Sequence, residues 1–264
     1  MILRFVAVAF GATWVGVAPL ALQGLGVLSG VPEWLHGAGA LGPLLAALSA
    51  VRATDWSAGL PALYGRWGEP GMTRAWTAAC LSTPVIFGAV AAVVAVVGGA
   101  ELVGSPGPAL RDGEWLLGLA VAAVLYGLGE EPGWRGWLLP RLQATRSPVR
   151  ATLILAPIWA AWHAPFFLYR YDFGGVGTLV GFFVGLLAGA FWLTFVFNST
   201  GGSVRVVASW HVLWNVANLV LAEVSSLAVA VLNVLMMALG FGVAAWYGPR
   251  GLRVGDAPIP TKEG

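Results

Sequence analysis

The chain has 264 residues, of which 58% are hydrophobic and only 10% are charged, and its mean hydropathy is +0.81. A soluble domain carries about a quarter charged residues, so this composition excludes a soluble globular protein and favours a single integral membrane domain over residues 1–264. The formal net charge of +2 is too small to indicate a nucleic-acid partner. The single cysteine, Cys80, excludes a disulfide framework within the chain.

Eight segments are long and apolar enough to cross a bilayer as helices, each of which needs about 20 apolar residues. In chain order they cover about 5–28, 37–53, 76–99, 114–130, 152–169, 175–198, 206–222 and 226–247. The first segment lacks a convincing cleavage site and is expected to be retained as a helix. The sequence therefore predicts an all-α, polytopic transmembrane bundle of about eight spans.

The basic residues divide unequally between the two sides of such a bundle. With the amino terminus inside, 12 of the 14 Lys and Arg residues fall on one side, and only Arg111 and Arg170 fall on the other. The positive-inside rule then predicts that both termini are cytoplasmic. One Lys against 13 Arg, with much Ala, Gly and Val, is typical of a bacterial protein, so the expected location is a bacterial plasma membrane.

Tryptophan and glycine patterns predict two packing features. Nine Trp residues near span ends are expected to form an interfacial aromatic belt: Trp14, Trp34, Trp56, Trp67, Trp76, Trp115, Trp134, Trp137 and Trp246. The stretch 133–142 is expected to lie along the inner interface. Glycines at every fourth position, Gly177, Gly181, Gly185 and Gly189, predict close approach of another helix to the sixth segment.

Two adjacent acids, Glu130 and Glu131, end the fourth segment. Successive helix positions differ by about 100°, so one carboxylate can face a cavity while Glu131 pairs with Arg135, four positions on. An acid without a cation partner is suited to act as a general base. The alternative is a solvated helix end with a plain ion pair.

Two histidines lie at membrane depth in later segments. His163 is in the middle of an apolar span, and Trp159, one turn before it, can wall the same pocket. His211 and Asn215 are four apart and share a helix face, where they can donate hydrogen bonds to an oxyanion. The alternatives are a packing histidine and polar contacts between helices, the latter also expected for Asn218. His36, expected in an outer loop, is assigned no role.

These three motifs together resemble those of the CAAX protease and bacteriocin-processing family of intramembrane endopeptidases, which includes the Ras-converting prenyl protease. Glu130, Glu131 and Arg135 match the family's Glu-Glu-x-x-x-Arg motif. Trp159 and His163 match Phe-x-x-x-His with Trp in place of Phe, and the third motif, His-x-x-x-Asn, is also present. The resemblance covers about residues 126–218, within an expected catalytic core of about 114–222, whereas residues 1–113 carry no matching motif.

The resemblance implies a helical bundle with a polar cavity, in which Glu130 and His163 activate a water that attacks a peptide carbonyl. It further implies that His211 and Asn215 stabilise the oxyanion, while Glu131 and Arg135 are structural or orienting. A zinc ion held by Glu130, His163 and His211 would be a three-ligand catalytic site. The helix signature His-Glu-x-x-His is absent, so no cofactor is expected to be required and no metal to be tightly bound.

Two other classes of function fit the same residues. A non-catalytic scaffold or bacteriocin self-immunity protein would keep the motifs for packing. A proton-coupled transporter can also use Glu and His in a bundle, although the internal symmetry typical of transporters is not visible in the sequence. The expected partners are the lipid bilayer and a peptide or membrane-protein substrate. The sequence does not determine the substrate or the oligomeric state.

Overall fold

The computed structural model describes residues 1–53, 72–98, 113–171, 173–223 and 225–254, together with positions 59, 61, 63 and 261. All regular structure in these residues is helical, which confirms the predicted all-α class. The elements are α1 (Ile2–Gly24), η1 (Glu33–Leu35), α2 (His36–Gly39), α3 (Leu41–Arg52), α5 (Met72–Gly98), α6 (Gly113–Glu131), η4 (Pro132–Leu138), α7 (Leu139–Gln143), α8 (Pro148–Trp162), η5 (Ala164–Leu168), α9 (Val176–Ser199), α10 (Val204–Ala222), α11 (Ser226–Tyr247) and η6 (Gly248–Arg250).

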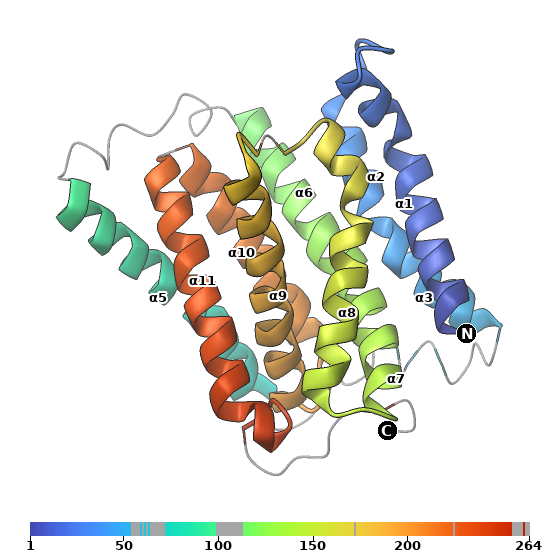
Figure 1. Cartoon of the computed structure of the whole chain (residues 1–264), viewed down its shortest axis with the longest axis vertical. Coiled ribbons are helices and arrows are strands. Elements are labelled where there is room, and N and C mark those ends of the chain that lie inside the picture. Colours follow the sequence, from blue (N-terminus) through green and yellow to red (C-terminus); the bar gives the residue numbers. More distant parts are fainter. Residues whose placement is uncertain are drawn as a thin grey trace.

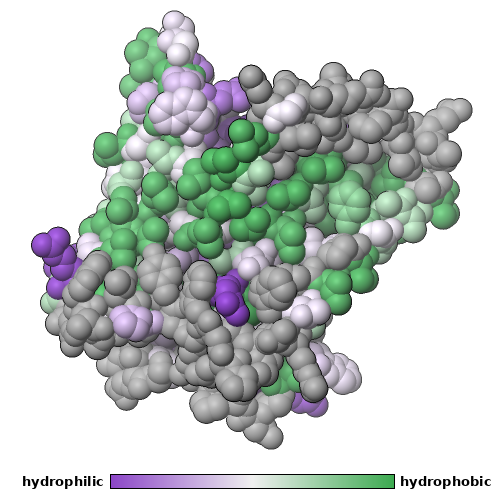
Figure 2. Space-filling view, turned by 180° about the vertical axis from the view of Figure 1, so that it is seen from behind, coloured by the Kyte–Doolittle hydropathy of each residue, from purple (hydrophilic) through white to green (hydrophobic). Residues whose placement is uncertain are grey.

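The helices form an up-and-down bundle, and successive rods run in opposite directions (Figure 1). Six stretches of the described residues are long and apolar enough to cross a membrane: Ile2–Gly24, Glu33–Arg52, Pro148–Leu168, Val176–Ser199, Val204–Ala222 and Ser226–Arg250. Figure 2 shows apolar residues gathered in a broad band across the middle of one face, as contact with lipid requires. The chain is an integral membrane protein, and the count of eight spans remains a prediction.

The fourth predicted segment does not end at the tandem acids. α6 runs directly into η4, a π-helix that begins at Pro132, and then into α7. Pro132 has no N–H to donate to the α-helical ladder, and π-helical turns occur mostly as bulges inside α-helices. The rod therefore continues for twelve residues beyond Glu131, as far as Gln143. Glu130 and Glu131 therefore lie inside the bundle and not at its end.

The prediction that residues 133–142 lie along the inner interface is wrong. Trp134 and Trp137 are buried, and Phe5 of α1 stacks on Trp137 with ring centroids 4.5 Å apart. These two residues therefore belong to the core and not to an aromatic belt, because flanking helices cover η4 on several sides.

Two exposed tryptophans fit the predicted interfacial belt, because Trp34 lies in the short η1 and Trp246 lies next to the last residue of α11. Trp14 is also exposed but lies in the middle of α1, so it does not mark a helix end. The predictions for Trp56, Trp67 and the side chains of Trp76 and Trp115 lie outside the described residues. Burial thus separates two groups of tryptophan that look alike in the sequence.

Close helix packing occurs on the α6–η4 rod instead of on the predicted glycine face of α9. A Cβ on Gly133 would lie 2.5 Å from Pro43 Cβ of α3, and one on Gly129 would overlap the carbonyl oxygen of Ala40. By contrast, a Cβ on Gly181 would meet nothing within 4 Å, and the same holds for Gly177 and Gly189. The predicted close approach is therefore wrong for these three glycines, whereas a Cβ on the fourth, Gly185, would lie 3.3 Å from Met237 Cε of α11.

Polar contacts from α1 fix the end of α8 that carries His163. Thr13 Oγ1 accepts a hydrogen bond from Trp162 Nε1 at 2.7 Å and donates one to Gly39 O at 2.7 Å. Trp14 Nε1 donates to Trp162 O at 3.2 Å. The amino-terminal helices, which carry no recognisable motif, therefore hold a part of the candidate site in place.

We expect Gly133→Val to lower the free energy of unfolding by about 1–3 kcal/mol, because the added side chain would displace α3 from the rod that carries the acids. The thermal unfolding midpoint of the detergent-purified protein measures this effect. Gly181→Val is the matched control, since it adds the same side chain to a helix where space is open. Equal midpoints for the two variants would contradict the packing argument.

Candidate functional site

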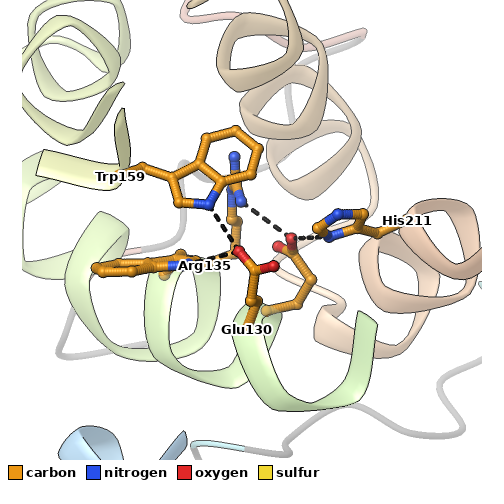
Figure 3. Close-up of polar contacts among 6 residues, drawn as sticks. Glu130, Arg135, Trp159 and His211 are labelled. Carbon is orange, nitrogen blue, oxygen red and sulfur yellow. Dashed lines mark hydrogen bonds and ion pairs between the residues drawn. The ribbon is translucent and has the colours of Figure 1, made fainter. Parts of the chain in front are cut away.

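Glu130 lies at the centre of the site and is held by two indoles. Its Oε2 accepts hydrogen bonds from Trp159 Nε1 of α8 at 2.6 Å and from Trp134 Nε1 of η4 at 3.1 Å (Figure 3). The side chain is only 1% exposed, and no cation contacts it among the described residues. Both bonds use Oε2, so Oε1 has no hydrogen-bond partner within the described part of the chain.

Glu131 has a different environment, with two cationic or proton-bearing partners. Arg135 Nη1 donates to Glu131 Oε1 at 3.0 Å, and the same oxygen lies 2.7 Å from His211 Nδ1 of α10. A carboxylate can only accept here, so Nδ1 of His211 carries the hydrogen. The predicted pairing of Glu131 with Arg135 is confirmed, and the pair is fully buried.

Several polar atoms of this ion pair lack partners. The guanidinium of Arg135 lies over the Trp159 ring, with its Cζ 4.6 Å from the ring centroid. Arg135 Nε and Nη2 and Glu131 Oε2 are buried and have no hydrogen-bond partner among the described residues. Buried polar groups of this kind are ordinarily satisfied by internal water, so the surroundings of the pair are suited to hold water.

His163 follows the last residue of α8, and its tautomer is fixed by the backbone. Its Nδ1 lies 2.7 Å from Trp159 O, and since a carbonyl oxygen only accepts, Nδ1 donates. In the neutral ring, Nε2 is then an acceptor. Aromatic rings surround the imidazole, with Trp162 at 4.8 Å and Phe182 at 5.6 Å between ring centroids. Nε2 is therefore left to accept a hydrogen bond from another group.

His211 and Asn215 lie one turn apart on α10, as their spacing predicts. Asn215 is half-buried, and no hydrogen bond from it to the described residues is found. Asn218 donates to Trp214 O of its own helix at 3.0 Å. This contact does not join two helices, contrary to the expectation for Asn218. The side-chain amide of Asn215 remains able to bind another group.

The structure brings the predicted residues together around Trp159. This indole contacts Glu130 by its hydrogen bond, and its ring centroid lies 5.8 Å from that of His163 and 6.1 Å from that of His211. Figure 3 shows Glu130, Trp159 and His211 pointing toward one another from α6, α8 and α10. These contacts place Glu130, His163 and His211 around one indole, whereas no contact of Asn215 with it is found among the described residues. His163 and His211 keep 8% and 6% exposure, so the imidazoles form the more accessible edge of the cluster.

Two features of the site were not recognised in the sequence. Trp134 donates to Glu130 from four positions on, so helical spacing could have indicated it. His36 is not in a loop but begins α2, where Tyr126 Oη lies 2.7 Å from its Nε2 and Tyr169 Oη lies 2.7 Å from its Nδ1. These partners are distant in sequence, so no local signal could have indicated the contacts of His36.

The side chains do not form a ready metal site. The described residues contain no group of three or more His, Cys, Asp and Glu side chains placed to hold a metal ion. Nδ1 of each histidine and Oε2 of Glu130 are engaged, which leaves Nε2 of both rings and Oε1 of Glu130 without partners among the described residues. These atoms are of the types that bind zinc, but the three residues are not placed as one metal-binding group in this arrangement.

We expect Arg135→Met to destabilise the protein by about 3–5 kcal/mol, because it leaves the buried Glu131 carboxylate without its cation. The double variant Glu131→Leu, Arg135→Met removes both charges and should recover part of this loss. Thermal unfolding in detergent is the measurement, and Arg150→Met, at an exposed position, is the control. Equal losses in the single and double variants would contradict a coupled pair.

Comparison with known proteins agrees with the geometry. Residues 112–217 match the family model of type II CAAX prenyl endopeptidases, described as Rce1-like. No curated protein matches the chain. The matched stretch contains Glu130, Glu131, Arg135, Trp159, His163, His211 and Asn215, and so includes every residue predicted for the site. Over residues 112–217, the part that carries the site, this membrane protein is therefore similar to the type II CAAX prenyl endopeptidases.

Proposed function

We propose that the protein is an intramembrane endopeptidase that hydrolyses a peptide bond of a membrane-associated substrate, with Glu130 and His163 activating the water. The observation that carries the proposal is the unequal treatment of two adjacent acids. Glu131 is neutralised by Arg135 and His211, whereas Glu130 has only indole donors on one oxygen. A carboxylate without a cation partner retains the ability to take a proton.

Water activation needs two acceptors that face the same small space. Glu130 Oε1 lacks a partner among the described residues, and Nε2 of His163 is an acceptor because Nδ1 donates to Trp159 O. Trp159 links both groups, through its indole N–H to Glu130 and its carbonyl to His163. A water between them would donate to both, and Glu130 would take its proton as the oxygen attacks the peptide carbonyl.

The developing oxyanion needs hydrogen-bond donors, and we assign this role to His211 and Asn215. Glu131 accepts from Nδ1 of His211, and a carboxylate in that place also stabilises the doubly protonated ring, whose Nε2–H can then donate to the oxyanion. Asn215, one turn further along α10, supplies an amide N–H. Glu131 and Arg135 thus act by orienting His211 and not by contacting the substrate.

The membrane orientation follows from charge. Arg4, Arg146 and Arg250 belong to elements that meet at the end of the bundle where α1 begins and α11 ends, whereas Arg170 follows η5 at the opposite end (Figure 1). By the positive-inside rule, we assign the first end to the cytoplasm. We propose a single membrane domain with a catalytic core of about 114–222 in a bacterial plasma membrane, where a substrate without a prenyl group is expected.

We expect Glu130→Gln to slow peptide-bond hydrolysis by about 10²–10⁴-fold, the usual contribution of a general base. The amide oxygen of Gln still accepts from both indoles, so the unfolding midpoint should stay close to that of the wild type. The measurement is proteomics of membranes from strains that carry either form, followed by cleavage of the identified peptide by the purified protein. His163→Ala is expected to reduce the rate similarly.

Asn218→Ala is the matched control, because the side-chain hydrogen bond of this residue goes to the backbone of its own helix and its loss should leave cleavage unchanged. Full biological function of both the Glu130→Gln and His163→Ala variants would overturn the enzymatic proposal in favour of a scaffold or immunity protein. Proton or solute flux in liposomes that depends on Glu130 would favour a transporter.

The proposed mechanism uses no tightly bound metal. We expect the purified, active protein to contain well under one zinc ion per chain and to keep its activity after dialysis against a chelator. Elemental analysis by mass spectrometry, with the same preparation assayed before and after chelation, tests this. One stoichiometric zinc that chelation removes together with activity would replace the glutamate mechanism by a zinc mechanism.

A further inference from the structure

A second polar feature lies at the end of the bundle that we assign to the cytoplasm, away from Glu130. It is a cavity of about 900 Å³ between the turn that joins α7 to α8 and the segment that follows α11. Its lining includes three arginines, Arg146 from the turn and Arg250 and Arg253 from the segment. We call it the arginine cavity. None of the residues assigned to catalysis lines it.

Among the described residues, no carboxylate compensates the positive charge of the arginine cavity. The contacts of Arg146 and Arg250 with described residues are a hydrogen bond to the Thr145 hydroxyl and ring contacts with Trp246 and Tyr247. Arg253 Nε is buried and has no hydrogen-bond partner among the described residues. No described lining residue is acidic. Three guanidinium groups around one hollow, without carboxylates from the described residues, form a site suited to an anion.

The walls of the cavity are fixed by contacts deeper in the bundle. Gln143 and Asn198 exchange amide hydrogen bonds of 3.1 and 2.9 Å, and Asn198 Nδ2 also donates to Gly251 O at 3.1 Å. Asn198 therefore ties the end of α7 to the segment that carries Arg250 and Arg253. The backbone between Arg250 and Arg253 is thus held against the bundle.

Two neighbouring features indicate which anion fits. The amino-terminal end of α8, at Ser147 and Pro148, lines the cavity, and this end of a helix carries a partial positive charge. Trp246, at the end of α11, is exposed, as is typical of a tryptophan at the level of lipid headgroups. Basic residues at this level attract anionic lipids. The position at the interface favours a lipid phosphate over a soluble one.

We propose that the arginine cavity binds the phosphate group of an anionic phospholipid headgroup. The phosphate accepts hydrogen bonds from Arg146, Arg250 and Arg253. The acyl chains of the lipid extend along the apolar surface beside Trp246. This proposal is independent of the proposed proteolytic function, because it requires none of the catalytic residues.

The test is thermal unfolding of the full chain in neutral detergent while a short-chain phosphatidylglycerol is titrated in. We expect the unfolding midpoint to rise and saturate, whereas phosphatidylcholine of the same chain length should not raise it. The variant Arg146→Gln, Arg250→Gln should weaken the apparent affinity about 25-fold, or about fivefold for each arginine. Native mass spectrometry should show one retained phosphatidylglycerol in the wild type and none in the variant.

The control is Arg4→Gln, Arg150→Gln, which removes two exposed arginines at the same end of the bundle that do not line the cavity. Equal weakening by this control would mean diffuse surface charge and would overturn the proposal. Inorganic phosphate or glycerol phosphate that stabilises the protein as strongly as the lipid would overturn the lipid assignment. If the double variant does not fold, Arg146→Gln alone, at an exposed position, gives the same comparison with a fivefold effect expected.

Discussion

The Glu131 carboxylate, buried with Arg135 and His211, is the interaction on which the site depends. A buried charge is tolerated only when it is paired and hydrogen-bonded. Arg135 lies one turn along the same rod, and His211 comes from α10, so the requirement for a partner fixes α6 and η4 against α10. The same contact fixes the hydrogen on Nδ1 of His211 and so sets the direction in which Nε2 points. The Glu131 carboxylate thus both neutralises the charge of Arg135 and orients the imidazole of His211.

Glu130 differs from its neighbour because of the helix that follows it. The α6 rod continues as a π-helix from Pro132 and places Trp134 against Glu130, while Trp159 of α8 approaches the same oxygen. Glycines along the rod allow α3 to pack closely against it. The Phe-x-x-x-His motif of the CAAX protease and bacteriocin-processing family has Phe at the position of Trp159. Here the indole N–H adds a hydrogen bond that a phenyl ring cannot supply.

The sequence predicted the all-α membrane fold and proposed candidate residues for the site. Hydropathy located the helices because each span needs a continuous apolar segment, a property of neighbouring residues. The scarcity of ionisable groups in those segments pointed to Glu130, His163 and His211. The predictions failed where burial depends on other helices. Trp137 was placed at an interface and is in the core, and the glycine face of α9 was expected to receive a helix but is open at Gly181.

The amino-acid sequence by itself determined that this is a helical membrane protein and which polar side chains lie at membrane depth, since hydropathy and helical spacing are local properties. It also determined that Glu131 and Arg135 can pair, because they are four residues apart. Only the tertiary structure decided that Glu131 is shared with His211, that His36 lies between two tyrosines, and that Arg146 meets Arg250 and Arg253 around one cavity. These partners are separated by 80 or more residues in the chain, so the packing of whole helices, and no local pattern, brings them together.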